Sequence, residues 1–144
     1  MERPNHDDMR TDCPGMAGFA QLLLECPSTW GEAYLKNRDG SPRGFRWYQK
    51  DDLDCIASRI AHMDGRSVGK TVDLAALVLH FGNTRKNESI LVAAPFQGHL
   101  DTIIEEIEYQ LNQSEILRSG LARSVKGRAA IKRKPYYQIK FATG

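Results

Sequence analysis

The chain has little of what marks secreted, zinc-binding or membrane proteins. Its 144 residues include three cysteines, Cys13, Cys26 and Cys55, and no C-x-x-C pair. This odd number without metal-ligand spacing supports neither a disulfide framework nor a zinc site, so we expect reduced thiols. No apolar run approaches the length that spans a bilayer, and the N-terminal MERPNHDDMRTD is too acidic and polar for a signal peptide. We therefore expect a cytoplasmic protein without a membrane segment.

Acidic residues are absent from the end of the chain. All 18 Asp and Glu lie at or before Glu115, where 12 Lys or Arg leave a formal charge of −6, and the last 29 residues carry eight Lys or Arg. This asymmetry suggests contact between residues 118 to 140 and a polyanion such as DNA, although a basic surface is more often a solvated face or a complement to an acidic neighbour. Because no aromatic residues interleave the charges before Pro135, binding should be independent of sequence and sensitive to salt.

The order of patterns divides the chain into three parts. Residues 1–18 are polar and lack any period, which predicts a disordered N-terminus. Residues 19–44 form a lead-in, with a short helix in "GFAQLLLEC" stopped by Pro27 and then the turn-rich linker "KNRDGSPRG". Residues 45–144 hold the periodic apolar segments, and at 41% hydrophobic and 26% charged residues the chain has the composition of a globular protein.

The segments of this third part alternate between strand and helix patterns. "FRWYQKDDLDCIASRIAHM" predicts a helix from Gln49 through Ser58 and a short strand, and "KTVDLAALVLHF" predicts a buried helix ended by Gly82 and Asn83. "SILVAAP" has the pattern of a central strand, "GHLDTIIEEIEYQL" that of an amphipathic helix, and "YYQIKFATG" that of a last strand. This order predicts an α/β fold with a parallel sheet and flanking helices.

The loop "MDGRSVGKT" ends in Gly-Lys-Thr, as a phosphate-binding loop does, although Asp64 replaces the usual first glycine. Gly65 would supply some of the missing flexibility, and Gly69 would let the backbone approach phosphate. Lys70 would place its ammonium on the β and γ oxygens, and the Thr71 hydroxyl would hold Mg²⁺. The pattern therefore predicts ATP and Mg²⁺ as ligands. A plain helix start is the alternative interpretation.

Further side chains near this loop suit a nucleotide. Arg66, followed by Ser67 in the loop, could bring its guanidinium to the γ-phosphate during transfer, whereas a salt bridge to Asp64 is the structural alternative. Gln49 carries an amide that donates and accepts together and so matches the adenine edge, with an ordinary helix glutamine as the alternative.

"GRSVGKT", the upstream "FRWYQKDDL" and the downstream "ILVAAPFQGHLDTIIEEIEYQL" together resemble the ATPase domain of the large terminase subunits of tailed bacteriophages, the motors that pump DNA into capsids. The resemblance covers about residues 28 to 144. That family often has an arginine in a variant Walker A loop and an upstream aromatic-Gln element near the adenine. By this likeness Arg66, Gly69, Lys70 and Thr71 belong to the phosphate loop and Gln49 to the adenine site.

The resemblance implies a P-loop NTPase-like sheet, here as part of an incomplete ATPase domain, with Arg66 and Lys70 in catalytic roles. It also implies ATP-driven packaging of double-stranded DNA in a bacterial host, in a homo-oligomeric ring with the portal and the small terminase subunit as partners. Related helicase-superfamily ATPases share much of the pattern and remain an alternative. A non-enzymatic α/β module that binds nucleic acid is the third interpretation.

The chain lacks a recognisable catalytic strand ending in carboxylates. "TIIEEIEY" follows a 3.6-residue period, so we assign Glu105 and Glu106 to a helix and reject them as Walker B residues. In terminases that strand comes after the segments found here, so we expect the N-terminal part of a longer protein that alone hydrolyses ATP slowly or not at all. The four histidines show no metal-ligand spacing either: His6, His62, His80 and His99.

Overall fold

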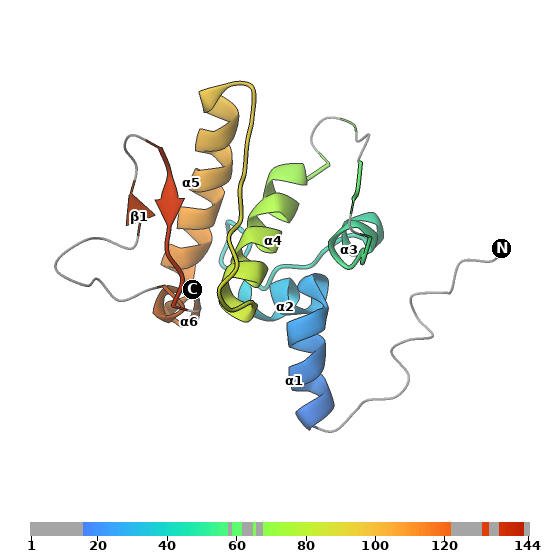
Figure 1. Cartoon of the computed structure of the whole chain (residues 1–144). Coiled ribbons are helices and arrows are strands. Elements are labelled where there is room, and N and C mark those ends of the chain that lie inside the picture. The colour runs from blue at the N-terminus through green and yellow to red at the C-terminus, as the bar shows by residue number, and fades with distance from the viewer. Residues whose placement is uncertain are drawn as a thin grey trace.

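The structure is a computed structural model that describes residues 16–57, 59–61, 65, 68–121, 131–132 and 136–142. These residues form six helices and one short hairpin, arranged as in Figure 1. In chain order they are α1 (Met16–Glu25), α2 (Pro27–Tyr34), α3 (Trp47–Leu53), α4 (Lys70–Thr84), α5 (Gln97–Gln113), α6 (Glu115–Ser119), β1 (Ile131–Lys132) and β2 (Gln138–Ile139).

The predicted parallel sheet is wrong. Within the described residues the strands are only β1 and β2, which pair antiparallel, with Ile131 opposite Ile139. The apolar run "SILVAAP" belongs to no strand or helix, and Leu91 within it is 91% exposed. An apolar run satisfies the pattern of a central strand, but a strand also needs hydrogen-bonded neighbours, and the described residues supply none here.

The other predicted elements of the third part have mixed outcomes. The helix expected from Gln49 to Ser58 begins at Trp47 and ends at Leu53. The strand expected in "RIAHM" is not formed in its described residues, 59–61, and His62 and Met63 lie outside them. The last predicted strand is confirmed only as β2 of the antiparallel hairpin.

Helices α4 and α5 pack against each other and form the centre of the molecule (Figure 1). Both helices were predicted, α4 from its nearly all-apolar segment and α5 from its 3.6-residue period, and both are confirmed. Helix α4 continues through its predicted stop, Gly82 and Asn83, and ends at Thr84. The buried apolar residues come from five of the helices and the segments between them: Trp30, Leu35, Phe45, Leu53, Ala75, Ala76, Leu79, Ile103, Ile107, Leu111 and Leu117. This core holds α4 in place, so the beginning of that helix has a fixed position relative to α3.

Pro27 both ends α1 and begins α2. Its fixed φ suits the first turn of a helix, and it occupies that turn of α2. The carboxylate of Asp54, just after α3, accepts hydrogen bonds from the backbone amide and the hydroxyl of Ser28. Lys50 adds an ion pair of 2.6 Å to Glu32. Helices α2 and α3 are therefore joined by polar contacts as well as by the core.

The predicted linker "KNRDGSPRG" is a turn that packs on α5. Gly40 has φ +82°, a conformation that favours glycine. Gln110 of α5 is 1% exposed, and its amide exchanges two hydrogen bonds of 2.9 Å with the backbone of Lys36. Arg38 forms a 2.7 Å ion pair with Glu106. These contacts fix the turn on the central helices.

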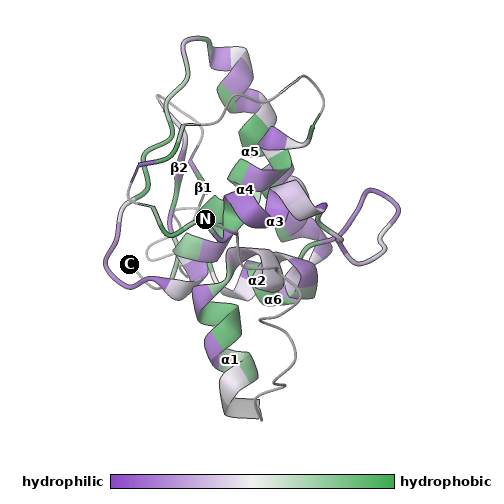
Figure 2. Cartoon of the chain, turned by 90° about the vertical axis from the view of Figure 1, so that its right-hand side faces the viewer, coloured by the Kyte–Doolittle hydropathy of each residue, from purple (hydrophilic) through white to green (hydrophobic). Residues whose placement is uncertain are grey.

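Helix α1 projects from the rest of the molecule (Figure 2). Its exposed apolar side chains include Phe19 and Leu24. Of the N-terminal part expected to be disordered, residues 1–15 lie outside the described residues, whereas residues 16–18 belong to α1. Cys26 and Cys55 are free thiols, and burial is the main cause that raises the pKa of Cys26. Across the part of the chain that the structure describes, no helix has both the length and the apolar character needed to cross a membrane.

Candidate functional site

The predicted phosphate loop leads directly into α4. Lys70 is the first residue of this 15-residue helix, and Gly69 immediately precedes it. Of the loop itself the structure describes Gly65, Val68 and Gly69, whereas Arg66 and Ser67 lie outside the described residues. The sequence-based placement of Gly-Lys-Thr at the start of a long helix is confirmed. The strand expected before the loop is not.

Gly69 is required by the local geometry. Its φ is +105°, which side-chain-bearing residues rarely adopt. A Cβ at this position would also lie 2.6 Å from the Nε2 atom of Gln49. The carbonyl of Gly69 accepts from the amides of Val72 at 2.9 Å and Asp73 at 3.1 Å, so the first turn of α4 closes on it.

Lys70 and Thr71 lie where the motif requires them. The Lys70 side chain is exposed, and its ammonium donates a 2.7 Å hydrogen bond to the carbonyl of Gly65. The ammonium therefore lies over the loop rather than over the body of the helix. Thr71 is the second residue of α4 and is partly exposed. The first turn of a helix has backbone N–H groups without intrahelical partners and carries the positive end of the dipole, which favours an anion.

Gln49 lies close to the loop, as the resemblance implied, but it is buried. Only 3% of it is exposed. Its Oε1 accepts from the amide of Arg46 at 3.0 Å, and its Nε2 donates to Oδ1 of Asp73 at 2.7 Å. The adenine-reading role of Gln49 stays a prediction, and it would require this side chain to leave both partners.

Two contacts near the loop were not predicted. Asp73, in the first turn of α4, receives the hydrogen bond from Gln49. The hydroxyl of Tyr48 lies 3.2 Å from the carbonyl of Val68 and donates to it. An acidic residue three positions after Lys70 was visible in the sequence as a helix-start signal. Its pairing with α3 was not, because that contact spans 24 residues.

The structure bears out the rejection of Glu105 and Glu106 as catalytic-strand residues. Both lie in α5. Glu106 is buried and binds Arg38 and Gln110, so it has a structural role. The described residues hold no group of three or more His, Cys, Asp or Glu side chains that could bind a metal ion. Thr71 therefore remains the predicted protein ligand of a Mg²⁺ that arrives with its nucleotide.

The basic C-terminal part is described only in pieces. Lys132 of β1 and Lys140, just after β2, are exposed. Tyr136 is 65% exposed, and its ring centroid lies 5.7 Å from the ammonium of Lys132. The remaining cations of this segment lie outside the described residues, apart from Arg118 in α6: Arg123, Lys126, Arg128, Arg133 and Lys134.

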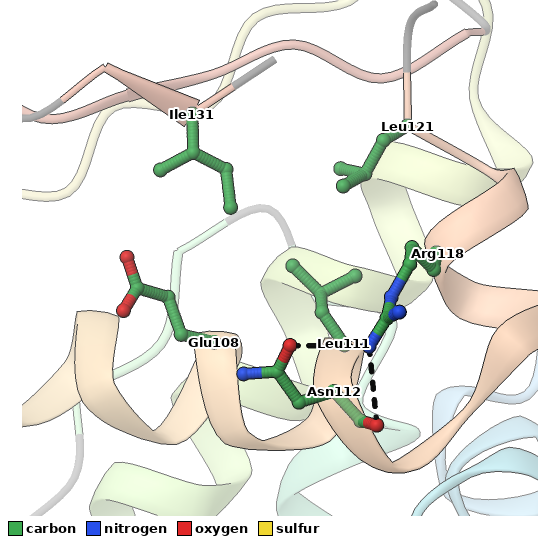
Figure 3. A pocket seen from close by; sticks show the side chains of 6 residues that line it. All are labelled: Glu108, Leu111, Asn112, Arg118, Leu121 and Ile131. Carbon is green, nitrogen blue, oxygen red and sulfur yellow. Dashed lines mark hydrogen bonds between the residues drawn. The ribbon is translucent and has the colours of Figure 1, made fainter. Parts of the chain in front are cut away.

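Two hollows of the structure lie away from the loop. A groove of about 1020 Å³ runs between α4, α5, residues 88–92 and residues 136–141. A smaller hollow of about 440 Å³ lies beside the C-terminal end of α5, with Leu111, Leu121 and Ile131 among its lining residues (Figure 3). At its edge Arg118 donates to the backbone and side-chain oxygens of Asn112. Neither hollow is lined by a predicted site residue.

Comparisons of the chain with protein-family models, curated proteins and solved structures find no match. The assignment of a function therefore rests on the residues and geometry described above.

Proposed function

We propose that the loop before α4 binds the phosphates of Mg²⁺-ATP, and that the chain is the ATP-binding N-terminal part of a viral DNA-packaging motor. The observation that carries the proposal is the placement of Lys70. It begins a 15-residue helix directly after a left-handed glycine, and its ammonium lies 2.7 Å from the Gly65 carbonyl of the same loop. A cation, a helix N-terminus and a backbone without a side chain at Gly69 thus meet at one place.

Each residue of the site has a defined part in this proposal. Gly65 and Gly69 allow the backbone to approach the anion, and Lys70 exchanges its hydrogen bond to Gly65 for phosphate oxygens. The Thr71 hydroxyl would coordinate Mg²⁺, and Arg66 would approach the γ-phosphate. The bound nucleotide would supply the phosphoanhydride bond whose cleavage drives movement.

The remaining parts of the proposal concern partners. The exposed Lys132 and Lys140 belong to the basic C-terminal segment, which suits the phosphate backbone of double-stranded DNA. The resemblance to large terminase subunits supports a ring of copies that works with a portal and a small terminase subunit. In that setting ATP binding and hydrolysis would be coupled to DNA translocation.

The test is a Mg²⁺-ATP titration of the purified chain followed by thermal unfolding, with Lys70→Ala beside it. Saturating nucleotide at 100 times its Kd should stabilise the wild type by about 2.7 kcal/mol, a shift of several degrees. Lys70→Ala should lose most of this shift. Lys86→Ala, a change of an exposed lysine just beyond the other end of α4, is the matched control and should keep it. No shift in the folded wild type would contradict the proposal.

A second candidate function is a nucleic-acid-binding module whose loop is structural. It is favoured by the burial of Gln49, which donates a hydrogen bond to Asp73 beside the loop. This candidate predicts no ATP-dependent shift and an unchanged DNA affinity in Lys70→Ala. The same titration therefore separates the two.

A further inference from the structure

Helix α3 holds the end of the phosphate loop through two side chains. Tyr48 donates from its hydroxyl to the carbonyl of Val68, the residue before Gly69, at 3.2 Å. Gln49 donates to Asp73, four residues after Gly69, at 2.7 Å. The two contacts lie on either side of the left-handed glycine. We call Tyr48 and Gln49 the α3 latch.

The latch is itself held firmly. Gln49 also accepts from the amide of Arg46, which closes the beginning of α3. At the other end of α3, Leu53 is buried in the core and Asp54 binds Ser28 of α2. This rigid support keeps Tyr48 and Gln49 in fixed positions, because neither end of α3 can move without breaking core or polar contacts.

Gln49 also restricts the shape of the loop directly. Its Nε2 atom occupies the space where a Cβ of residue 69 would lie. The amide therefore packs against the backbone that, in the proposed function, faces the phosphates. A buried amide in this place has no free path to a base, since only 3% of the residue is exposed.

We propose that Gln49 is a positioning residue for phosphate: through Asp73 and Gly69 it sets the conformation of the loop and of the first turn of α4, and it does not read the adenine base. The inference rests on the proposed nucleotide site. Its consequence is that Gln49 contributes equally to the binding of any ligand that carries the same phosphates.

The experiment measures the affinities of Mg²⁺-ATP, Mg²⁺-GTP and inorganic tripolyphosphate by calorimetry for the wild type and Gln49→Met. Methionine has a similar length but makes neither hydrogen bond. The positioning role predicts that all three affinities fall together, by about tenfold, as expected for one lost bond to a charged group. A loss confined to ATP would overturn the inference in favour of base reading. Three unchanged affinities would also overturn it.

The matched control is Gln110→Met in α5. Gln110 is equally buried, and its amide also binds the backbone of another segment, at Lys36. This variant should lose comparable stability while keeping all three affinities. The control separates a local effect on the loop from a general loss of stability.

Variants that exchange the donor and the acceptor of the hydrogen bond between residues 49 and 73 give a second test. Gln49→Glu places two carboxylates together and should weaken the three ligands. Adding Asp73→Asn supplies an amide that can donate to Glu and should restore all three affinities. An adenine-reading glutamine would not be restored, because a carboxylate lacks the donor. Failure of restoration would overturn the positioning role.

A ligand-free measurement keeps this inference separate from the proposed function. Hydrogen exchange of the Val72 and Asp73 amides, which bond to the Gly69 carbonyl, should quicken in Gln49→Met and stay unchanged in Gln110→Met. If the wild type binds none of the three ligands, the proposed function fails. In that case, faster exchange of these amides in Gln49→Met would still support the role of Gln49 in holding the loop, and unchanged exchange would contradict it.

Discussion

At the scale of single residues, His80 shows how a polar side chain is fitted into the core. It is 1% exposed, its Nε2 atom lies 3.2 Å from the carbonyl of Leu23, and the edges of Trp30 and Phe81 surround it. Its Nδ1 atom is buried and has no hydrogen-bond partner in the described part of the chain. The protonated ring would therefore carry a donor without an acceptor.

This environment predicts a stability that falls in mild acid. Burial is the main cause that lowers the pKa of His80 below its ordinary 6.5, and the charge of Arg85 adds to it. As the pH falls below 6.5, His80 is protonated in the unfolded chain but stays neutral in the folded chain. The free energy of unfolding therefore decreases until the pH reaches the lower pKa of the folded chain. His80→Gln, which can still donate to Leu23, should remove up to about 1 kcal/mol per pH unit of this dependence.

The measurement is the urea midpoint of the wild type and His80→Gln between pH 7.5 and 5. The other titratable groups are the same in both proteins. The difference between their plots of urea midpoint against pH therefore gives the contribution of His80. Parallel curves would show that His80 has the same pKa in the folded and unfolded chain.

Gly82 is a second residue whose role depends on a close contact. It lies inside α4, and a Cβ there would collide with the ring of Phe141 beyond β2. Gly82→Ala should therefore cost about 1–3 kcal/mol of stability despite the better helix propensity of alanine. Gly98→Ala in α5 is the control. Nothing lies near its added methyl group, and it should gain roughly 0.5–1 kcal/mol.

Denaturant unfolding of both variants checks this expectation. If the contact with Phe141 is the cause, adding Phe141→Leu to Gly82→Ala should recover part of the loss. Equal stabilities of the two glycine variants would show that the C-terminal segment is not packed on α4.

At the scale of elements, local patterns predicted α1, α3, α4 and α5 but missed α2 and α6, and the strand pairing that they predicted is wrong. The α4 segment is apolar almost throughout, and the apolar positions of α5 repeat at helical spacing. Both signals depend only on neighbours in the chain. Residues 89–95 have a strand-like composition, but a strand is completed by residues far away in sequence. Pro27 was interpreted only as a stop, so α2, which it begins, was missed.

In the candidate site, too, the features with local sequence signals were predicted and the contacts between distant residues were not. The sequence placed Lys70 and Thr71 at a helix start correctly, because glycine and helix periodicity are local signals. It also selected Gln49 as a neighbour of the loop. The hydrogen bond from Gln49 to Asp73 was beyond sequence reasoning, because many side chains could have reached that turn.

The basic C-terminal segment carries a prediction at this scale. Binding of double-stranded DNA should weaken by about a hundredfold between 50 and 200 mM salt if roughly four phosphates are neutralised. Changing Lys132 and Lys140 together to alanine should lower the slope of log K against log salt by about two. Fluorescence anisotropy with a labelled duplex measures both. An affinity independent of salt would contradict the electrostatic picture.

At the scale of the whole molecule, the described residues of the proposed site supply binding groups but no identified carboxylate to prepare the attacking water. Asp73, the acidic residue in the first turn of α4, already accepts a hydrogen bond from Gln49, and Glu105 and Glu106 lie in α5. Hydrolysis of ATP requires both a carboxylate that organises Mg²⁺ and a group that orients water. We therefore expect this chain to bind ATP without hydrolysing it at a normal rate.

We expect the purified chain to bind Mg²⁺-ATP and yet release phosphate far more slowly than the 1–100 s⁻¹ that is typical of enzymes transferring phosphoryl groups. A phosphate-release assay at saturating ATP, with Lys70→Ala as the blank, measures this rate. Turnover in that typical range, abolished by Lys70→Ala, would mean that the chain supplies its own catalytic carboxylate. A rate equal to the blank beside a clear thermal shift would define the chain as a nucleotide-binding unit whose chemistry needs a group from elsewhere.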